Sequence, residues 1–161
     1  MQDERGIIVG YLLDLRKVVG HQPLVTVGAS VILLNEDNQI LLIHRRDNGL
    51  WGLPAGSTEI NEAPVDTAVR EVEEETGLRL RRDELALIQV FGGEDFFYTY
   101  PNGDQCSNVI ISYSARIKTQ KLTKITLETD DASWFSPSDI PTTIAKHEKI
   151  ILKYFLDKNC R

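Results

Sequence analysis

The sequence contains little cysteine and no long apolar run. Its two cysteines, Cys106 and Cys160, lie far apart, so they provide neither a disulfide framework nor a zinc cluster. We interpret them as a strand cysteine and a tail cysteine that stay reduced, as is usual in the cytosol. No stretch approaches the roughly 20 apolar residues that span a bilayer, and the first five residues lack the basic start of a secretory signal. We therefore expect a cytoplasmic protein without a membrane partner.

Basic side chains are also scarce. The chain carries 18 Lys and Arg against 24 Asp and Glu, for a net charge of −6 and a pI of about 5.1. Because a protein that grips a long phosphate backbone usually presents a basic face, we expect no stable nucleic-acid partner. An acidic protein can nevertheless bind a small polyphosphate if divalent cations neutralise both partners.

The length of 161 residues and the hydrophobic fraction of 42% suit a single compact domain over residues 1–161. Residues 7–19 are predicted to form an amphipathic helix, because Leu12, Leu15 and Val19 fall at helical spacing and Gly20 can end a helix. This helix packs either on its own subunit or on a second one, so a homodimer is one of two interpretations.

The rest of the chain alternates strand signals with turns. The Val- and Ile-rich residues 24–34 and 40–44 are predicted as buried strands joined in a hairpin. Further strands are predicted over residues 85–91, 96–100, 109–117 and 133–135. The segment Pro101-Asn102-Gly103-Asp104 indicates a hairpin turn between the second and third of these.

Two further helices are predicted, over residues 65–76 and 144–156. Pro64 suits the first turn of the earlier helix and Gly77 suits its C-terminal cap. Strands combined with one central and one terminal helix favour an α/β (α+β) fold, in which a mixed sheet lies between helices in an α/β/α arrangement.

The earlier of these helices carries an unusual acidic cluster. Because positions three and four apart share a face, Glu71 projects beside Glu74 and Glu75. Adjacent carboxylates repel one another unless a cation compensates them, and Arg70 supplies only part of that charge. A hard divalent cation such as Mg²⁺ would supply the rest, since it prefers oxygen ligands. A solvated acidic helix face is the alternative, but the preceding loop, rich in Gly and Pro and carrying Glu59, favours a metal site.

The stretch Gly56, Glu62, Arg70-Glu71-Val72, Glu74-Glu75 and Gly77-Leu78 matches every defined position of the Nudix box. That motif reads Gly-x5-Glu-x7-Arg-Glu-(apolar)-x-Glu-Glu-x-Gly-(apolar). The chain therefore resembles the Nudix (MutT-like) hydrolase family. The resemblance implies the Nudix fold and a pyrophosphohydrolase that requires Mg²⁺ or Mn²⁺. Its substrate would contain a nucleoside diphosphate linked to another moiety, as in a nucleoside triphosphate, a nucleotide sugar or ADP-ribose.

The resemblance also implies roles for individual residues. The metal ligands would be Glu71, Glu74, Glu75 and the carbonyl of Ala55. Arg70 would orient these glutamates, with Glu62 as its partner. Asn61 stands where many relatives have glycine, and we expect the loop to form because asparagine tolerates a positive φ.

The general base and the substrate contacts are less defined by the motif. Candidates for the base are Glu71 or Glu75 within the box and Glu128 or Asp131 outside it, the last two being otherwise ordinary loop carboxylates. Arg45 and Arg46 are candidate phosphate ligands, since arginine suits bidentate contacts. Candidate stacking residues for a nucleobase, or else core residues, are Trp51, Phe96, Phe97, Tyr98 and Tyr100.

Two other functions remain open at this point. Some Nudix domains lose catalysis and sense nucleotides, although the intact glutamate set argues against this. An RNA 5′-end pyrophosphohydrolase is disfavoured by the acidic charge. The sequence Phe91-Gly92-Gly93 lacks the proline that often marks ADP-ribose hydrolases, so no substrate subgroup is supported.

Overall fold

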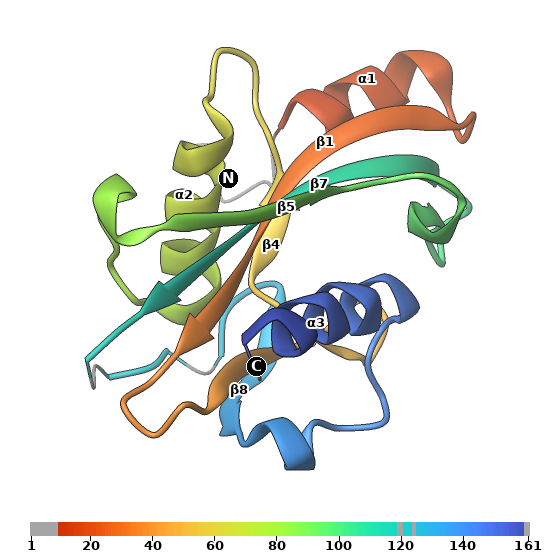
Figure 1. The fold of residues 1–161 in the computed structure, drawn as a ribbon. Coiled ribbons are helices and arrows are strands. Elements are labelled where there is room, and N and C mark those ends of the chain that lie inside the picture. Colours follow the sequence, from red (N-terminus) through yellow and green to blue (C-terminus); the bar gives the residue numbers. More distant parts are fainter. Residues whose placement is uncertain (1–9, 119–120, 124, 160–161) are drawn as a thin grey trace.

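A curved mixed sheet forms the centre of the computed structural model, which describes residues 10–118, 121–123 and 125–159 (Figure 1). The main strand order is β3-β2-β1-β7-β5. Helix α2 (Pro64–Thr76) and helix α3 (Lys146–Asn159) pack on opposite faces of this sheet. The predicted α/β/α arrangement is therefore confirmed.

The sheet is mixed because one strand pair is parallel. Strand β1 runs parallel to β7 over its whole length, whereas the other pairs are antiparallel. Outside the main order, β4 pairs with β1, β6 with β7 and β8 with β2. The strands are β1 (Leu24–Leu34), β2 (Ile40–Arg45), β3 (Trp51–Gly52), β4 (Ala55–Ser57), β5 (Ala86–Phe91), β6 (Phe97–Thr99), β7 (Gln105–Arg116) and β8 (Thr129–Phe135). Short 3₁₀ turns span Arg82–Glu84, Glu94–Phe96 and Pro137–Asp139.

The core has two parts, one on each face of the sheet. Val31 and Leu33 of β1 pack with Val72 of α2, whereas Ile32 packs with Ile151 of α3. Successive strand residues point to opposite faces, so a strand covered on both sides is apolar at nearly every position. This explains the apolar run over residues 31–34, whereas Val25 and Val27 near the start of β1 are 78% and 42% exposed.

Helix α1 spans Tyr11–Val19, which is shorter than the helix predicted over residues 7–19. Residues 7–9 of that prediction lie outside the described residues. No α1 residue is fully buried, but Leu12, Leu15 and Val19 are partly buried, and polar contacts also hold the helix on its own subunit. The Tyr11 amide donates to Glu59 at 2.8 Å, and the Arg16 guanidinium donates to the Gln105 carbonyl at 2.6 Å. Packing of α1 on a second subunit stays a prediction.

Apart from α1, three elements differ from their predicted ranges by more than one residue at an end. Strand β7 begins at Gln105 instead of residue 109, because the hairpin pairing Tyr98↔Cys106 continues through polar residues. Strand β8 begins at Thr129 instead of Ser133, since it pairs along the whole of β2. Helix α3 spans 146–159 instead of 144–156, because Ile144 still forms a bridge to β3. Cys106 is a buried strand cysteine as predicted, and Cys160 lies outside the described residues.

The ends of α2 follow the sequence signals. Pro64 occupies the first turn, and Gly77 ends the helix with a left-handed φ of 72°, which costs glycine little. Asn61 in the preceding loop has a φ of 63°, as predicted. Among the helices of the described residues, none combines the length and the apolarity needed to cross a membrane.

Candidate active site

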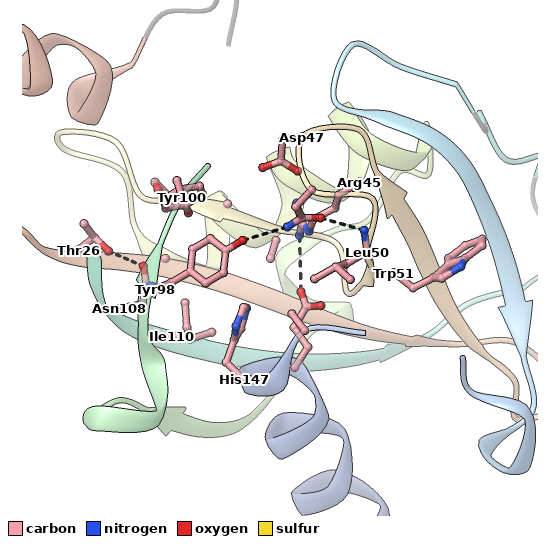
Figure 2. A pocket seen from close by; sticks show the side chains of 17 residues that line it. Thr26, Arg45, Asp47, Leu50, Trp51, Tyr98, Tyr100, Asn108, Ile110 and His147 are labelled. Atoms are coloured by element: carbon pink, nitrogen blue, oxygen red, sulfur yellow. Dashed lines mark hydrogen bonds and ion pairs between the residues drawn. The ribbon is translucent and has the colours of Figure 1, made fainter. Parts of the chain in front are cut away.

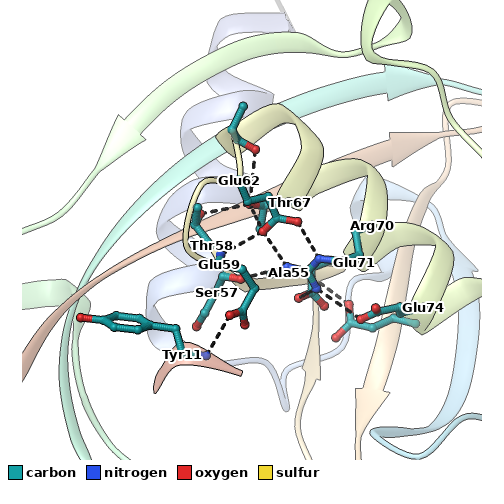
Figure 3. A network of polar contacts seen from close by, with 12 residues as sticks. Tyr11, Ala55, Ser57, Thr58, Glu59, Glu62, Thr67, Arg70, Glu71 and Glu74 are labelled. Carbon is teal, nitrogen blue, oxygen red and sulfur yellow. Dashed lines mark hydrogen bonds and ion pairs between the residues drawn. The ribbon is translucent and has the colours of Figure 1, made fainter. Parts of the chain in front are cut away.

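Arg70 of α2 contacts four residues in the part of the chain that carries the motif (Figure 3). Its guanidinium bonds Glu62 at 2.7 and 2.9 Å, Glu71 at 2.6 Å, Glu74 at 3.3 Å and the Ser57 carbonyl at 3.0 Å. These contacts leave Arg70 facing protein groups instead of solvent, with only 19% of its side chain exposed. Arg70 therefore fixes the loop before α2 against the acidic face of the helix.

Glu62 is the fixed anion of this network. Its hydrogen bond with Arg70 lowers its pKa to about 2, against a smaller opposing effect of burial. The Glu59 amide and the Thr67 hydroxyl also donate to the carboxylate of Glu62, at 3.0 and 2.9 Å. Since charge-assisted hydrogen bonds are the strong ones, Glu62 stays ionised and holds the guanidinium in one orientation.

Three carboxyl groups converge beside Arg70. Ligand atoms of Glu71, Glu75 and Glu128 lie within 4.8 Å of one another. Burial raises the pKa of Glu71 to about 7, although Arg70 opposes the shift. Burial raises the pKa of Glu75 further, to about 8, although Arg45 opposes it. Oxygen-rich, mutually repelling and partly protonated carboxyl groups are the donor set that a hard divalent cation would deprotonate and stabilise, so these residues fit Mg²⁺ or Mn²⁺.

Glycine lets the backbone approach these carboxyl groups closely. A Cβ at Gly56 would stand 2.0 Å from a Glu71 oxygen, and a Cβ at Gly28 would stand 2.7 Å from the Gly56 carbonyl oxygen. The Ala55 amide donates to Glu75 at 2.9 Å. Strand β4, pressed between β1 and α2, therefore brings the backbone of Ala55 and Gly56 to the acidic cluster.

Two candidate residues lie outside the tight cluster. Glu74 has 39% of its side chain exposed and contacts Arg70, at the solvent border of the site. Asp131 lies on β8 opposite His44 and accepts the amide of Ala132 at 2.8 Å. Glu128, by contrast, is the exposed member of the converging group.

Arg45 lies in the cleft, but its guanidinium is bonded to protein groups. It donates to the Leu53 carbonyl at 2.8 Å and lies 3.4 Å from Glu75 and 3.7 Å from Glu148. Burial lowers the Arg45 pKa, but the carboxyl groups of Glu75 and Glu148 outweigh this effect and raise it. The predicted phosphate ligand is therefore the counter-charge of two buried carboxyl groups, because it projects inward from β2.

Glu148 was not predicted, although it belongs to the floor of the cleft. It is 3% exposed, burial raises its pKa to about 7, and its Oε2 has no hydrogen-bond partner among the described residues. A Cβ at Gly52 would stand 2.2 Å from that oxygen, so only glycine fits there. The available signal was spacing, because Glu148 shares the apolar stripe of α3 with Ile151 and Leu152.

A cavity of about 120 Å³ opens beside the acidic cluster (Figure 2). Of the predicted stacking residues, Trp51, Tyr98 and Tyr100 line it, together with His147 of α3. Burial lowers the pKa of His147 to about 4, so its imidazole is neutral at pH 7. The cavity therefore presents several uncharged ring groups at one end of the cleft.

Three of the candidate substrate residues do not line this cavity. Phe97 is 46% exposed and points away from the cavity, because it alternates with Tyr98 along β6. Arg46 donates to the carbonyls of Thr126 and Thr129, both at 3.1 Å, so it supports the loop that carries Glu128. Phe96 is buried in the core on the α3 side.

Comparisons with known proteins agree with this arrangement. The NUDIX domain model matches residues 24–155. A "MutT-like protein" of Streptomyces ambofaciens is 32% identical over 136 residues, covering 84% of this chain and 79% of that one. An "ADP-ribose pyrophosphatase" of Methanocaldococcus jannaschii is 32% identical over 131 residues, covering 79% of this chain and 72% of that one.

The fold is also found in solved structures. The NUDIX domain of Shewanella oneidensis NrtR, determined with ADP ribose, superposes with a TM-score of 0.70 at 17% identity, covering 90% of this chain and 97% of that one. At this identity the likeness shows the fold. Together with the domain match, these comparisons define the class of protein as a hydrolase with a NUDIX domain. The chain belongs to the Nudix family, with relatives named as pyrophosphatases and diphosphatases.

Proposed function

We propose that this protein hydrolyses a pyrophosphate bond in a nucleoside diphosphate linked to another moiety, and that it requires Mg²⁺ or Mn²⁺. The observation that supports this proposal best is the convergence of Glu71, Glu75 and Glu128 within 4.8 Å. The cluster lies at the wall of a cleft that also holds aromatic rings. This reaction needs carboxyl groups that can hold a metal ion, next to a cavity that can hold a nucleobase.

In this proposal Glu71, Glu74, Glu75 and the carbonyl of Ala55 hold the metal. A bound Mg²⁺ or Mn²⁺ would polarise the phosphoryl oxygens and lower the pKa of the attacking water. Arg70 orients Glu71 and Glu74 through its direct contacts with both.

We assign Glu128 as the first candidate for the general base. It is the exposed carboxylate of the group, so solvent water can reach it. Glu71 and Glu75 are instead buried and face positive charge from Arg70 and Arg45. Asp131 is the weaker candidate outside the motif, because it lies outside the converging group.

The test is a substrate panel incubated with Mg²⁺, with Mn²⁺ and with EDTA, and analysed by chromatography. The panel contains nucleoside triphosphates, oxidised triphosphates, ADP-ribose, nucleotide sugars and dinucleoside polyphosphates. We expect metal-dependent release of a nucleoside monophosphate from one class. Binding without turnover across the panel would contradict the proposal and favour a nucleotide sensor.

RNA that carries a 5′-triphosphate is the comparison substrate that tests the alternative of an RNA 5′-end pyrophosphohydrolase. We expect a free nucleotide to be the better substrate, because the net charge of −6 repels a nucleic-acid backbone. Faster turnover of the RNA would favour a 5′-end pyrophosphohydrolase.

A further inference from the structure

One part of the central sheet carries an apolar surface that none of the described elements covers. It lies on the same face as α2, because Val25 and Val27 point to the same side of β1 as Ala29, which packs in the core beside α2. The neighbouring strands β7, β5 and β6 place further apolar side chains in register on this face. The apolar sheet face consists of Val25 and Val27 of β1, Leu87 and Val90 of β5, Phe97 of β6, and Val109 and Ile111 of β7.

The large side chains of the apolar sheet face are well exposed. The exposed fractions are 78% for Val25, 42% for Val27, 62% for Leu87, 51% for Val90 and 46% for Phe97. The two residues of β7 lie between them and are partly buried. Together these residues expose on the order of 500 Å², as much as the largest apolar patch on a typical monomer, and a patch of that size is often a contact surface.

The strands that form this face carry almost no charge, although the chain as a whole does. Strands β1, β5 and β6 contain no charged residue, and β7 contains only Arg116 at its far end. By contrast, 26% of all residues are charged. Strand β5 stands at the edge of the main strand order, where charged side chains commonly prevent association. A neutral edge beside an exposed apolar face therefore favours association.

Charge also indicates which partner this face fits. A nucleic acid or a strongly charged protein would find no complementary charge on a neutral face. Two copies of this chain, each with a net charge of −6, repel one another where their acidic surfaces meet. They approach with the least repulsion where both surfaces lack charge. A second copy, meeting the apolar sheet face with its own, satisfies this condition.

The area of the face agrees with a reversible dimer. A two-fold axis brings the same patch of both copies together, and two sheets can pack face to face about 10 Å apart. The two patches would bury on the order of 1,000 Å², and a polar rim would bring the contact to the low end of the roughly 1,200–2,000 Å² of specific interfaces. The dimer is therefore expected to dissociate on dilution.

We propose that the apolar sheet face is the contact surface of a reversible homodimer, in which the sheets of two copies pack against each other. The contact leaves the cleft open, because Thr26 and Asn108, which line the cavity with the aromatic rings, point to the opposite face of β1 and β7. It also places the interface on the sheet and not on α1, where the exposed Val18 lies next to the charged, exposed Lys17. The inference does not depend on which bond the protein cleaves.

Val90→Lys tests this interface, and Val18→Lys is its matched control. Val90 lies within the apolar sheet face, paired with Ile111, whereas Val18 lies on α1 and is 83% exposed. Both changes put the same charge on an exposed valine, so both should leave the fold intact. Equal circular dichroism spectra and melting temperatures at about 1 µM, where the wild type is expected to be monomeric, would verify this.

The readout is sedimentation equilibrium between about 1 and 100 µM. We expect the wild type to dimerise over this range, and Val18→Lys to have the same dissociation constant within about twofold. Val90→Lys should raise the dissociation constant at least about 100-fold, because the two-fold axis introduces two unpaired lysines into one interface. In the wild type only, and not in Val90→Lys, the backbone amides of residues 86–91 should exchange hydrogen more slowly at the higher concentration.

Three results would overturn the proposal. The first is a wild type that stays monomeric at about 100 µM, and co-sedimentation of that monomer with phosphatidylcholine vesicles would assign the face to a lipid surface instead. The second is a dimer that Val90→Lys leaves intact, and its loss in Val18→Lys would place the contact on α1. The third is an equal weakening of the dimer by both lysines, because a general effect of charge would then explain the loss.

Discussion

Replacing Glu75 by Gln should change how the stability of the metal-free protein depends on pH. The Glu75 side chain is 1% exposed, and its pKa is raised from 4.5 to about 8 chiefly by burial. Because the folded state then binds this proton more tightly than the unfolded state, the unfolding free energy is at its full value below pH 4.5 and falls as the pH rises towards 8. Glutamine does not ionise, so the Glu75→Gln variant should escape this loss.

The magnitude follows from the shift. Between pH 4.5 and pH 7 the unfolded carboxyl group releases its proton and the folded one keeps it, at about 1.4 kcal/mol per pH unit. The wild type should therefore lose about 3 kcal/mol of unfolding free energy over that range through Glu75. In the variant, the side-chain amide nitrogen of the glutamine must face another donor, either the Ala55 backbone amide or the Arg45 guanidinium. This mismatch costs about 1–2 kcal/mol at every pH.

The two effects predict a crossing of the stability curves. Glu75→Gln should be less stable than the wild type by about 1–2 kcal/mol at pH 4. It should be more stable by about 1–2 kcal/mol at pH 7, or about 2–8 °C in melting temperature for a chain of this size. Activity should nevertheless be lost, because the metal site lacks a carboxylate.

The assay is urea denaturation in EDTA at pH 4, 5, 6 and 7. Glu73→Gln is the control, because Glu73 lies on the same helix with 50% of its side chain exposed and pairs with surface Arg79. The control should follow the wild type within about 0.5 kcal/mol. Parallel pH curves for Glu75→Gln and the wild type would refute the reasoning that burial holds Glu75 protonated.

Four further predictions can be checked with similar methods. Glu74→Gln should lower kcat more than about 100-fold, about 3 kcal/mol of transition-state stabilisation, while circular dichroism stays unchanged; full activity would contradict a metal-site role. Gly52→Ala should cost about 1–3 kcal/mol in denaturation, because its Cβ would displace Glu148, whereas Gly92→Ala, with its nearest neighbour atom at 3.6 Å, should be tolerated. Leu78→Ala, at a side chain with 0% exposure, should cost about 2–5 kcal/mol but leave the KM of the folded enzyme unchanged. Mg²⁺ at 100 times its dissociation constant should stabilise the wild type by about 2.7 kcal/mol, and EDTA should remove this together with the activity.

Local signals determined much of the fold. Apolar runs fixed β1 and β2, the alternation of Val31 and Leu33 with Ile32 follows from strand geometry, and Pro64 with Gly77 set the limits of α2. These features depend on near neighbours in the chain, so they can be predicted without tertiary information. Boundaries were less predictable where pairing with a distant strand prolonged an element, as in β7 and β8.

The motif determined the acidic cluster for the same reason. Spacing on one helix brings Glu71 and Glu75 to one face, and the Arg70 contacts with Glu62 join residues only eight positions apart. The sequence could not decide between Glu128 and Asp131, because that choice depends on how the loop before β8 meets α2. Only the tertiary structure places Glu128 with the buried pair.

Long-range packing decided what the arginines and aromatic residues contact. Arg45 and Arg46 are neighbours in sequence, yet strand alternation sends one guanidinium inward to Glu75 and Glu148 and the other to the loop that carries Glu128. A cavity of about 500 Å³ is likewise walled by α1 residues such as Leu12 and Leu13, because long-range contacts with Glu59 and Gln105 hold that helix in place. The sequence by itself determined the fold class and the acidic motif, since both follow from local spacing. The shape and the charge of the cleft were set by contacts between residues far apart in the chain.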